Sequence, residues 1–272
     1  MAASFDRRDL LVGGLAASAA FAPLGEAFAQ RRRLSPNDKV QVGVIGCKGM
    51  GWSNLTAMMK GADVAPVALC DVDAKVLAER GAELQKASGR TPRLYDDYRR
   101  MLDDPSVDAV IIATPDHWHA LQLIDAMSAG KAVYCEKPLG NSIAECRAMV
   151  AAKQRHGGIV QVGQWQRSNQ HWADAIAHVH AGGIGRVRKV KAWAYMGWMK
   201  RIPPLPDQAA PAGVDYESWL GPARRRPFNP NRFHFNWRWH WDYAGGLMTD
   251  WGVHLVDMAL LGMKAQAQNS IS

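Results

Sequence analysis

The chain has 272 residues, of which 48% are hydrophobic and 21% are charged, and this balance excludes a disordered or fibrous protein. The formal net charge is +8, but no nucleic-acid-binding motif accompanies the basic residues, so we expect no nucleic-acid partner. Eleven tryptophans are many for this length. They favour an aromatic-lined site or a subunit interface, with a tryptophan-rich core as the alternative.

The first 29 residues resemble an export signal. The segment 6–11 carries the pair Arg7-Arg8, residues 10–24 are apolar, and Ala27-Phe28-Ala29 has the form of a cleavage site. We expect residues 1–29 to be a twin-arginine signal peptide and the mature protein to be periplasmic. The apolar run is too short for a permanent membrane span, although an uncleaved anchor is an alternative.

From residue 38 onward, short apolar runs alternate with helical segments. We expect strands at 40–45, 64–70, 109–113, 132–135 and 159–162, and helices at 51–60, 74–87, 118–129 and 143–156. This alternation predicts right-handed βαβ units with a parallel sheet covered on both faces. The predicted fold class is therefore α/β, with a Rossmann-type doubly wound sheet over residues 38–162.

The pattern changes after Gly163. Residues 186–198 form a long strand-like run, a proline-rich loop follows, residues 236–243 are dense in aromatic side chains, and a helix is expected at about 247–261. We assign residues 163–272 to a second, α+β domain.

Four cysteines are present, but no pair has the CxxC spacing of a zinc site. They are Cys47, Cys70, Cys135 and Cys146. Most of them lie at the ends of predicted strands, where buried free thiols are common. We expect neither a zinc site nor a disulfide.

A glycine-rich segment, residues 43–51, follows the first strand and opens the first helix. In the dinucleotide fingerprint G-x-G-x-x-G, Gly46 and Gly51 would fill the outer positions, while Lys48 replaces the middle glycine. Asp71 ends the next strand about 20 residues later, where an acid binds the ribose hydroxyls. The segment predicts a site for NAD, with NADP disfavoured by the Asp71 carboxylate; an ordinary glycine-rich turn is the alternative.

Two further motifs follow strands at the carboxyl edge of the predicted sheet, where open α/β sheets bind ligands. Residues 114–119 read Thr-Pro-Asp-His-Trp-His, a sequence that also suits a helix N-terminus. Its two histidines could pair on a metal, but no third ligand is indicated, so we expect none. Glu136-Lys137-Pro138 would place a lysine beside the nicotinamide for acid–base chemistry, although such a triplet by itself is usually a solvated turn.

The fourth motif, residues 245–257, reads Gly-Gly-x-x-x-Asp-x-Gly-x-His-x-x-Asp. A helix would put Asp250, His254 and Asp257 on one face. An aspartate and a histidine one turn apart can form a proton-transfer pair. Gly252 is a poor helix former and suggests a close approach to the backbone. A capped amphipathic helix and a metal site are the alternatives.

In this order, the four motifs resemble those of the Gfo/Idh/MocA oxidoreductases, over about residues 40–261. The resemblance implies a Rossmann domain followed by a domain with an open antiparallel sheet, NAD or NADP as cofactor, and hydride transfer at a hydroxyl carbon of a sugar or polyol. It makes Lys137 and His254 catalytic, with Asp250 supporting them. The residues implied at the cofactor are Gly46, Lys48, Gly49, Met50, Gly51, Asp71, Thr114, Pro115, His119 and Glu136.

A sugar-like substrate would be bound by the second domain. Trp165, Trp239 and Trp241 are candidates for stacking on a sugar ring, with core packing as the alternative for each. We also assign Arg167 and Asp257 to the substrate site.

Family chains usually continue well beyond the last helix. We therefore expect this chain, which ends at Ser272, to be truncated with an incomplete C-terminal sheet, and the full-length protein to be a homo-oligomer. Two other functions stay open: a hydrolase or lyase that oxidises its sugar transiently on a retained NAD, and a non-catalytic nucleotide-binding protein. Net production of free reduced cofactor would separate the first from a dehydrogenase.

Replacing both Arg7 and Arg8 by lysine should block export, because the twin-arginine machinery reads that pair. Cell fractionation should then find the precursor, with residues 1–29 attached, in the cytoplasm. Mature protein in the periplasm of this variant would refute the twin-arginine signal.

Overall fold

The computed structural model describes residues 38–197 and 201–264, which all belong to one compact unit. The export signal predicted at 1–29 lies outside these residues. Within them, none of the helices has the length and apolar character that a membrane crossing needs.

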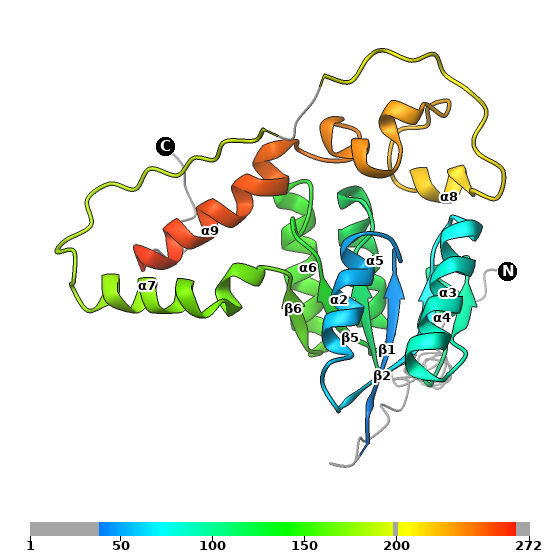
Figure 1. Cartoon of the computed structure of the whole chain (residues 1–272), viewed down its shortest axis with the longest axis horizontal. Coiled ribbons are helices and arrows are strands. Elements are labelled where there is room, and N and C mark those ends of the chain that lie inside the picture. Colours follow the sequence, from blue (N-terminus) through cyan, green and yellow to red (C-terminus); the bar gives the residue numbers. More distant parts are fainter. Residues whose placement is uncertain (1–37, 198–200, 265–272) are drawn as a thin grey trace, which may run out of the picture. The chain divides into compact units, whose positions relative to one another are not determined.

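A six-stranded, entirely parallel sheet forms the first half of the described chain (Figure 1). The strands are β1 (Val40–Ile45), β2 (Val64–Cys70), β3 (Arg93–Tyr95), β4 (Ala109–Ile112), β5 (Ala132–Cys135) and β6 (Val160–Val162). Their order in the sheet is β3-β2-β1-β4-β5-β6, which confirms the predicted fold class. The order reverses between β1 and β4, so the loops after these strands diverge and leave a crevice at the carboxyl edge.

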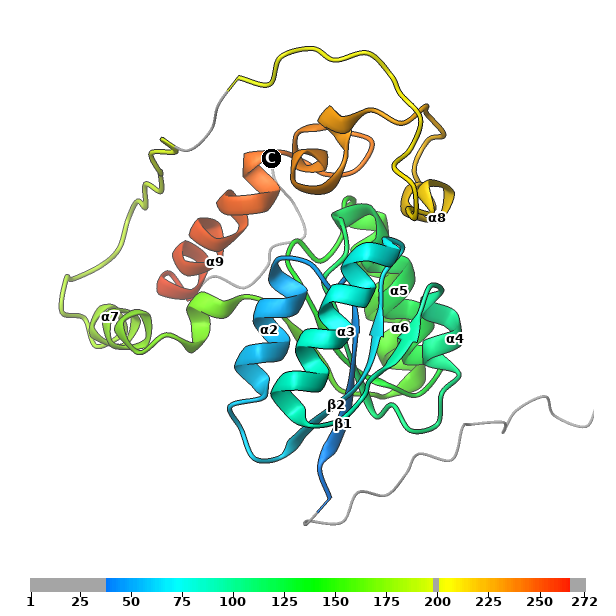
Figure 2. The same ribbon diagram turned by 45° about the vertical axis from the view of Figure 1, so that its right-hand side comes forward.

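Helices cover both faces of the sheet (Figure 2). On one face lie α2 (Met50–Met58) and α3 (Ala74–Ser88); on the other lie α4 (Tyr98–Leu102), α5 (Asp116–Ser128) and α6 (Ile143–His156). The strands are nearly continuous apolar runs because both faces are buried. Each face has its own core, with Leu55 and Leu84 on the first and Leu123 and Met127 on the second.

Local signals in the sequence set the ends of the longer helices. Asp73 caps α3 by accepting hydrogen bonds from the N–H groups of Lys75 and Val76. Ser142 and Glu145 form a capping box at the start of α6, and Gly157, at φ +65°, ends it in the left-handed conformation. The predicted bounds of α3 and α6 are therefore confirmed to within a residue, whereas the short β3 and α4 were not predicted.

The second half of the described chain is mostly helices and loops. Its helices and turns are η1 (Trp165–Ser168), α7 (Gln170–His180), α8 (Tyr216–Leu220), η2 (Pro230–Arg232), η3 (His234–Trp239), η4 (Met248–Gly252) and α9 (Val253–Gly262). The strand predicted at 186–198 is wrong over 186–197, which has no strand pairing within the described residues. A strand-like sequence needs a neighbouring strand to bond its backbone, and none lies beside this one.

The helix predicted at 247–261 is confirmed, but it opens with the π-helical turn η4. A Cβ atom on Gly252 would lie 2.6 Å from the Met248 sulfur. The close approach expected at Gly252 therefore comes from the same turn and not from a distant segment.

Residues 208–246, which we call the cap, have a hydrophobic cluster of their own. Its buried members are Trp219, Leu220, Phe228, Phe233, Trp237, Tyr243 and Ala244. Backbone hydrogen bonds hold the cap to the end of β2: the Asp215 N–H donates to the Val72 carbonyl, and the Ala74 N–H to the Gly213 carbonyl, each at 2.9 Å. The Trp118 indole N–H also donates to the Trp219 carbonyl at 3.0 Å. The cap therefore lies over the carboxyl edge of the sheet.

Gly51→Ala should destabilise the fold strongly, because a Cβ atom there would collide with the Gly46 carbonyl oxygen. Backbone atoms cannot move aside as a flexible side chain can, so we expect the free energy of unfolding to fall by about 2 kcal/mol or more. Chemical denaturation measures it. Gly61→Ala is the control, since its Cβ would meet only the Met58 carbonyl at an ordinary 3.4 Å; equal losses in the two variants would contradict this packing.

Candidate functional site

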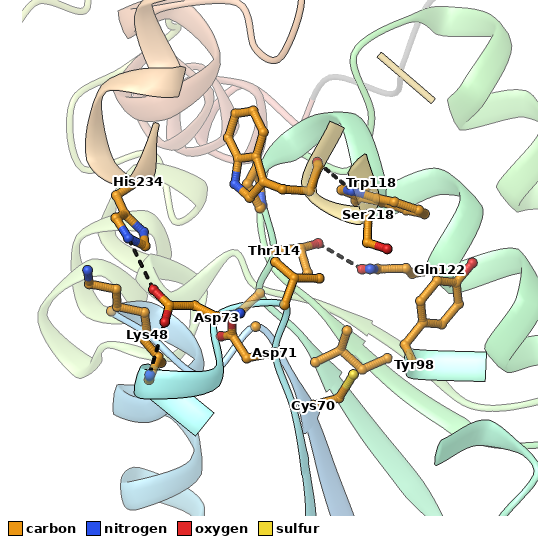
Figure 3. Close-up of a pocket in the computed structure, with 18 of the residues that line it drawn as sticks. Lys48, Cys70, Asp71, Asp73, Tyr98, Thr114, Trp118, Gln122, Ser218 and His234 are labelled. Atoms are coloured by element: carbon orange, nitrogen blue, oxygen red, sulfur yellow. Dashed lines mark hydrogen bonds and ion pairs between the residues drawn. The ribbon is translucent and has the colours of Figure 1, made fainter. Parts of the chain in front are cut away.

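A cavity of about 840 Å³ lies between the carboxyl edge of the sheet and the cap (Figure 3). Its volume is within the range of small-molecule sites. Of the predicted site residues, its walls contain Gly46, Lys48, Gly49, Met50, Asp71, Thr114, Pro115, His119, Glu136, Lys137 and Asp250. The structure thus brings all four sequence motifs to one cavity.

The loop between β1 and α2 has the backbone geometry that a dinucleotide phosphate requires. Gly46, at φ +86°, packs so tightly that a Cβ would lie 2.8 Å from the Ala113 carbonyl oxygen. Gly49 lies at φ +50° before the first turn of α2, with nothing within 4 Å of a Cβ position. In the fingerprint, the middle glycine lets the diphosphate approach the backbone closely. Lys48 occupies that position here, and the backbone is open at the next residue, Gly49. The loop fits a diphosphate at the N-terminus of α2.

Asp71 lines the cavity just beyond β2, at the end where the ribose of the cofactor would lie. One carboxylate oxygen accepts a hydrogen bond from the Cys47 N–H at 2.8 Å, and the other accepts from the Asp73 N–H at 3.1 Å. Burial raises the pKa of Asp71, and these N–H groups oppose that shift. A carboxylate accepts up to about four hydrogen bonds, so Asp71 can still accept from ribose hydroxyls.

His119 lies between the loop that follows β4 and the loop that follows β5. Its ring nitrogens lie 2.7 Å from the Pro138 carbonyl oxygen and 2.9 Å from the Thr114 carbonyl oxygen. The ring is 1% exposed, so its role is to hold the loops after β4 and β5 together. His117 is likewise committed to the Trp219 carbonyl, at 3.1 Å. Both rings of the possible metal pair thus have backbone partners.

Lys137 and Asp250 meet in the cavity although they are distant in sequence. The Lys137 ammonium donates to the Asp250 carbonyl oxygen at 2.7 Å and to its carboxylate at 2.8 Å. Their side chains are only 13% and 14% exposed. Glu136, next in the chain, is buried and accepts a hydrogen bond from the Asn54 amide at 2.8 Å. A buried ion pair that faces a cavity is expensive to keep unless it has a role.

The sequence did not single out Arg238 or Asp116, which complete this polar cluster. The Arg238 guanidinium contacts the same Asp250 oxygen at 3.3 Å and lies 4.3 Å from the centre of the Trp237 ring. Burial raises the pKa of Asp116 to about 8, against the opposing charges of Lys137 and Arg238, so this acid is protonated at neutral pH. Asp116 belongs to the motif at residues 114–119, but nothing in the sequence of that motif indicated that it is buried near Lys137.

His254 lies one turn beyond Asp250, at the start of α9. It is 4% exposed, its Nδ1 has no hydrogen-bond partner among residues 38–197 and 201–264, and the Trp165 ring stands edge-on at 5.7 Å. Burial, with the nearby charge of Lys137, lowers the pKa of His254 below its usual range. The ring is therefore neutral at pH 7 and able to accept a proton, although it does not line the cavity itself.

The other predicted substrate residues are not gathered at the cavity. Arg167 and Asp257 pair with each other through two hydrogen bonds of 2.8 and 2.6 Å. Trp239 packs on Phe235, and Trp241 is 90% exposed. In this turn of the cap the wall tryptophan is Trp237, which the aromatic density of the segment could not distinguish from its neighbours.

Comparison with known proteins identifies the family. The model described as "Oxidoreductase family, NAD-binding Rossmann fold" matches residues 40–164, and that described as "Oxidoreductase family, C-terminal alpha/beta domain" matches residues 189–270. The chain belongs to the Gfo/Idh/MocA oxidoreductases, and its first domain is the NAD-binding Rossmann domain of that family.

Among its relatives is inositol 2-dehydrogenase 2 of Saccharopolyspora erythraea, 33% identical over 190 residues, which are 66% of this chain and 53% of the relative. An oxidoreductase domain protein from Kribbella flavida superposes with a TM-score of 0.62 at 29% identity, over 84% of this chain and 54% of its own. The structure of scyllo-inositol dehydrogenase from Lactobacillus casei, with bound NAD(H) and scyllo-inositol, superposes with a TM-score of 0.50 at 25% identity. The match covers 54% of this chain and 43% of that enzyme. The chain spans about half the length of the curated relatives it matches.

The ribose end of the cavity predicts a preference for NAD over NADP. The partly buried Asp71 carboxylate would repel a 2′-phosphate at contact distance, and Asp73 adds a second acid beside it. We expect NAD to bind at least about tenfold more tightly, a difference of about 1.4 kcal/mol. Calorimetric titration of both cofactors into the apo protein measures it. Equal or tighter binding of NADP would show that Asp71 does not face the ribose.

Proposed function

We propose that this protein is an NAD-dependent oxidoreductase that moves a hydride between the nicotinamide ring and a hydroxyl-bearing carbon of a sugar or polyol. The observation that carries the proposal is the Lys137–Asp250 pair, which faces a cavity whose opposite end has the glycine loop and Asp71. A nucleotide-binding protein without chemistry has no use for a half-desolvated lysine at this position.

Lys137 would act on the substrate oxygen. An ammonium has three donor hydrogens, and Asp250 occupies two of them through its carbonyl and its carboxylate. The third can donate to the hydroxyl oxygen of the substrate and stabilise the negative charge that develops as the C–H bond breaks. The nicotinamide supplies the carbon that accepts the hydride.

Asp250 would orient Lys137 instead of contacting His254. Its carboxylate is shared between Lys137 and Arg238. Because the Lys137 ammonium also donates to the backbone carbonyl of Asp250, the lysine cannot turn away from the cavity. His254, neutral at physiological pH, would take the hydroxyl proton as the hydride leaves, which requires a movement that brings its ring to the cavity wall.

The substrate class is inferred from relatives named as inositol dehydrogenases. An inositol ring carries secondary hydroxyls, each of which offers the oxygen that Lys137 would bind and the C–H bond that would be broken. We extend the proposal to sugars and polyols as a class. We also propose that the mature protein works in the periplasm, as the twin-arginine pattern at Arg7 and Arg8 favours.

Replacing Lys137 by alanine should lower kcat about a hundredfold or more, because it removes a contact made to the developing oxyanion. NAD binding should stay nearly unchanged, since the lysine lies at the far end of the cavity from Asp71. Rates of NADH formation with a panel of inositols and sugars, and the Kd of NAD by calorimetry, test the two halves of this prediction.

Lys153→Ala is the matched control, because this lysine lies in the last turn of α6 and outside the cavity. Unchanged turnover of the Lys137 variant would exclude that residue from the mechanism. A stoichiometric burst of bound NADH with no net release would instead support the hydrolase or lyase alternative.

A further inference from the structure

His234 belongs to the cap but lies against the cofactor end of the cavity. Its Nε2 is 3.4 Å from a carboxylate oxygen of Asp73, and His234, Asp73 and Lys48 all line the cavity walls. Figure 3 shows the three side chains together beside Asp71. None of the sequence motifs includes His234.

The backbone of His234 has a conformation that its side chain does not favour. Its φ is +47°, and the other described non-glycine residue with positive φ is Lys264, just beyond the end of α9, where left-handed residues commonly end helices. A histidine in this region is strained, and such residues concentrate where a ligand must be held. His234 is the first residue of η3, and its side chain lines the cavity.

One acid and one cation act on the imidazole, Asp73 and Lys48. One Asp73 oxygen caps α3 through the N–H groups of Lys75 and Val76, and the other faces His234. Burial lowers the pKa of His234, and so does the charge of Lys48, which belongs to the glycine loop. Lys48, Gly49 and His234 all line the cavity, and nothing in the described residues lies within 4 Å of a Cβ position on Gly49.

We propose that His234 binds the diphosphate of NAD from the cap side, opposite the glycine loop. Asp73 holds Nε2–H, so Nδ1 is the nitrogen that faces the anion. The imidazole takes up one proton when NAD binds, and Nδ1–H then donates to a phosphate oxygen. NAD would therefore be held by both halves of the chain, and its binding would fix the cap over the cavity.

The charged groups that face the imidazole are Asp73 at the start of α3 and Lys48 in the glycine loop. A bound diphosphate adds negative charge and favours the imidazolium. Affinity for NAD should therefore rise as the pH falls from about 8 and go on rising below the usual histidine pKa of about 6.5, because the pKa of the free imidazole is lowered. This dependence should disappear when the imidazole is replaced.

The test is calorimetric titration of NAD into the wild-type protein and into His234→Asn, in two buffers that differ in ionisation enthalpy. Asparagine tolerates positive φ and is too short to keep the contact. We expect the Kd for NAD to rise about tenfold, the equivalent of about 1.4 kcal/mol, and the proton uptake seen in the wild type to vanish. His171→Asn, an exposed histidine on α7 outside the cavity, should behave as the wild type.

A second ligand and a second variant separate this contact from a structural role. Adenosine, which has no phosphate, should lose less than about threefold in affinity on His234→Asn. His234→Gly removes the strain, so its thermal stability should match or exceed that of the wild type while NAD affinity still falls. Unchanged NAD binding in both variants, or equal losses for NAD and adenosine, would overturn the proposal. Because the readout is binding, an absence of hydride transfer would count against the proposed function alone.

Discussion

The contact between Lys137 and Asp250 is the interaction on which the site depends. Two opposite charges, each about 14% exposed or less, have lost most of their water, and that loss is recovered only if the geometry is good. The pair has a second bond from the ammonium to the Asp250 carbonyl oxygen, so the lysine is tied to backbone as well as to a carboxylate. Arg238 contacts the same carboxylate oxygen at 3.3 Å.

Two further buried groups, His119 and Asp116, lie around this pair. His119, fully buried, ties the loop that carries Lys137 to the loop after β4. Asp116 is protonated at neutral pH because burial outweighs the two nearby cations, so it adds no second negative charge to compete for Lys137. The cluster therefore has few charged groups. Lys137, Asp250 and Arg238 each have a partner of opposite charge.

The Rossmann half could be predicted from sequence because its signals are local. Apolar runs such as that of β1, capping residues such as Asp73, and the glycine loop all lie within a few residues of the structure they determine. The extended run at 186–197 was predicted as a strand from the same kind of signal, and it fails because a strand also requires a partner that periodicity cannot supply.

Within the site, the sequence identified the residues that belong to motifs. It missed the residues that only the tertiary fold brings to the cavity. Lys137 and Asp250 could be named from their motifs, but their mutual contact could not. Arg238 and His234 come from an aromatic-rich segment where spacing carries no signal, and only the fold of the cap turns Trp237 inward and Trp241 outward. The choice of Trp239 and Trp241 over Trp237 shows that composition locates a segment without fixing its orientation.

The way the cap is attached has a consequence for the order in which the molecule folds. Trp118 and Trp219, Asn141 and Tyr243, and Lys137 and Asp250 are separated by 101, 102 and 113 residues, whereas successive βαβ units of the sheet close over much shorter loops. Contacts of large sequence separation carry the higher loop-closure entropy and form late. We therefore expect the Rossmann half to form before the cap docks on it, so that Lys137 meets Asp250 late in folding.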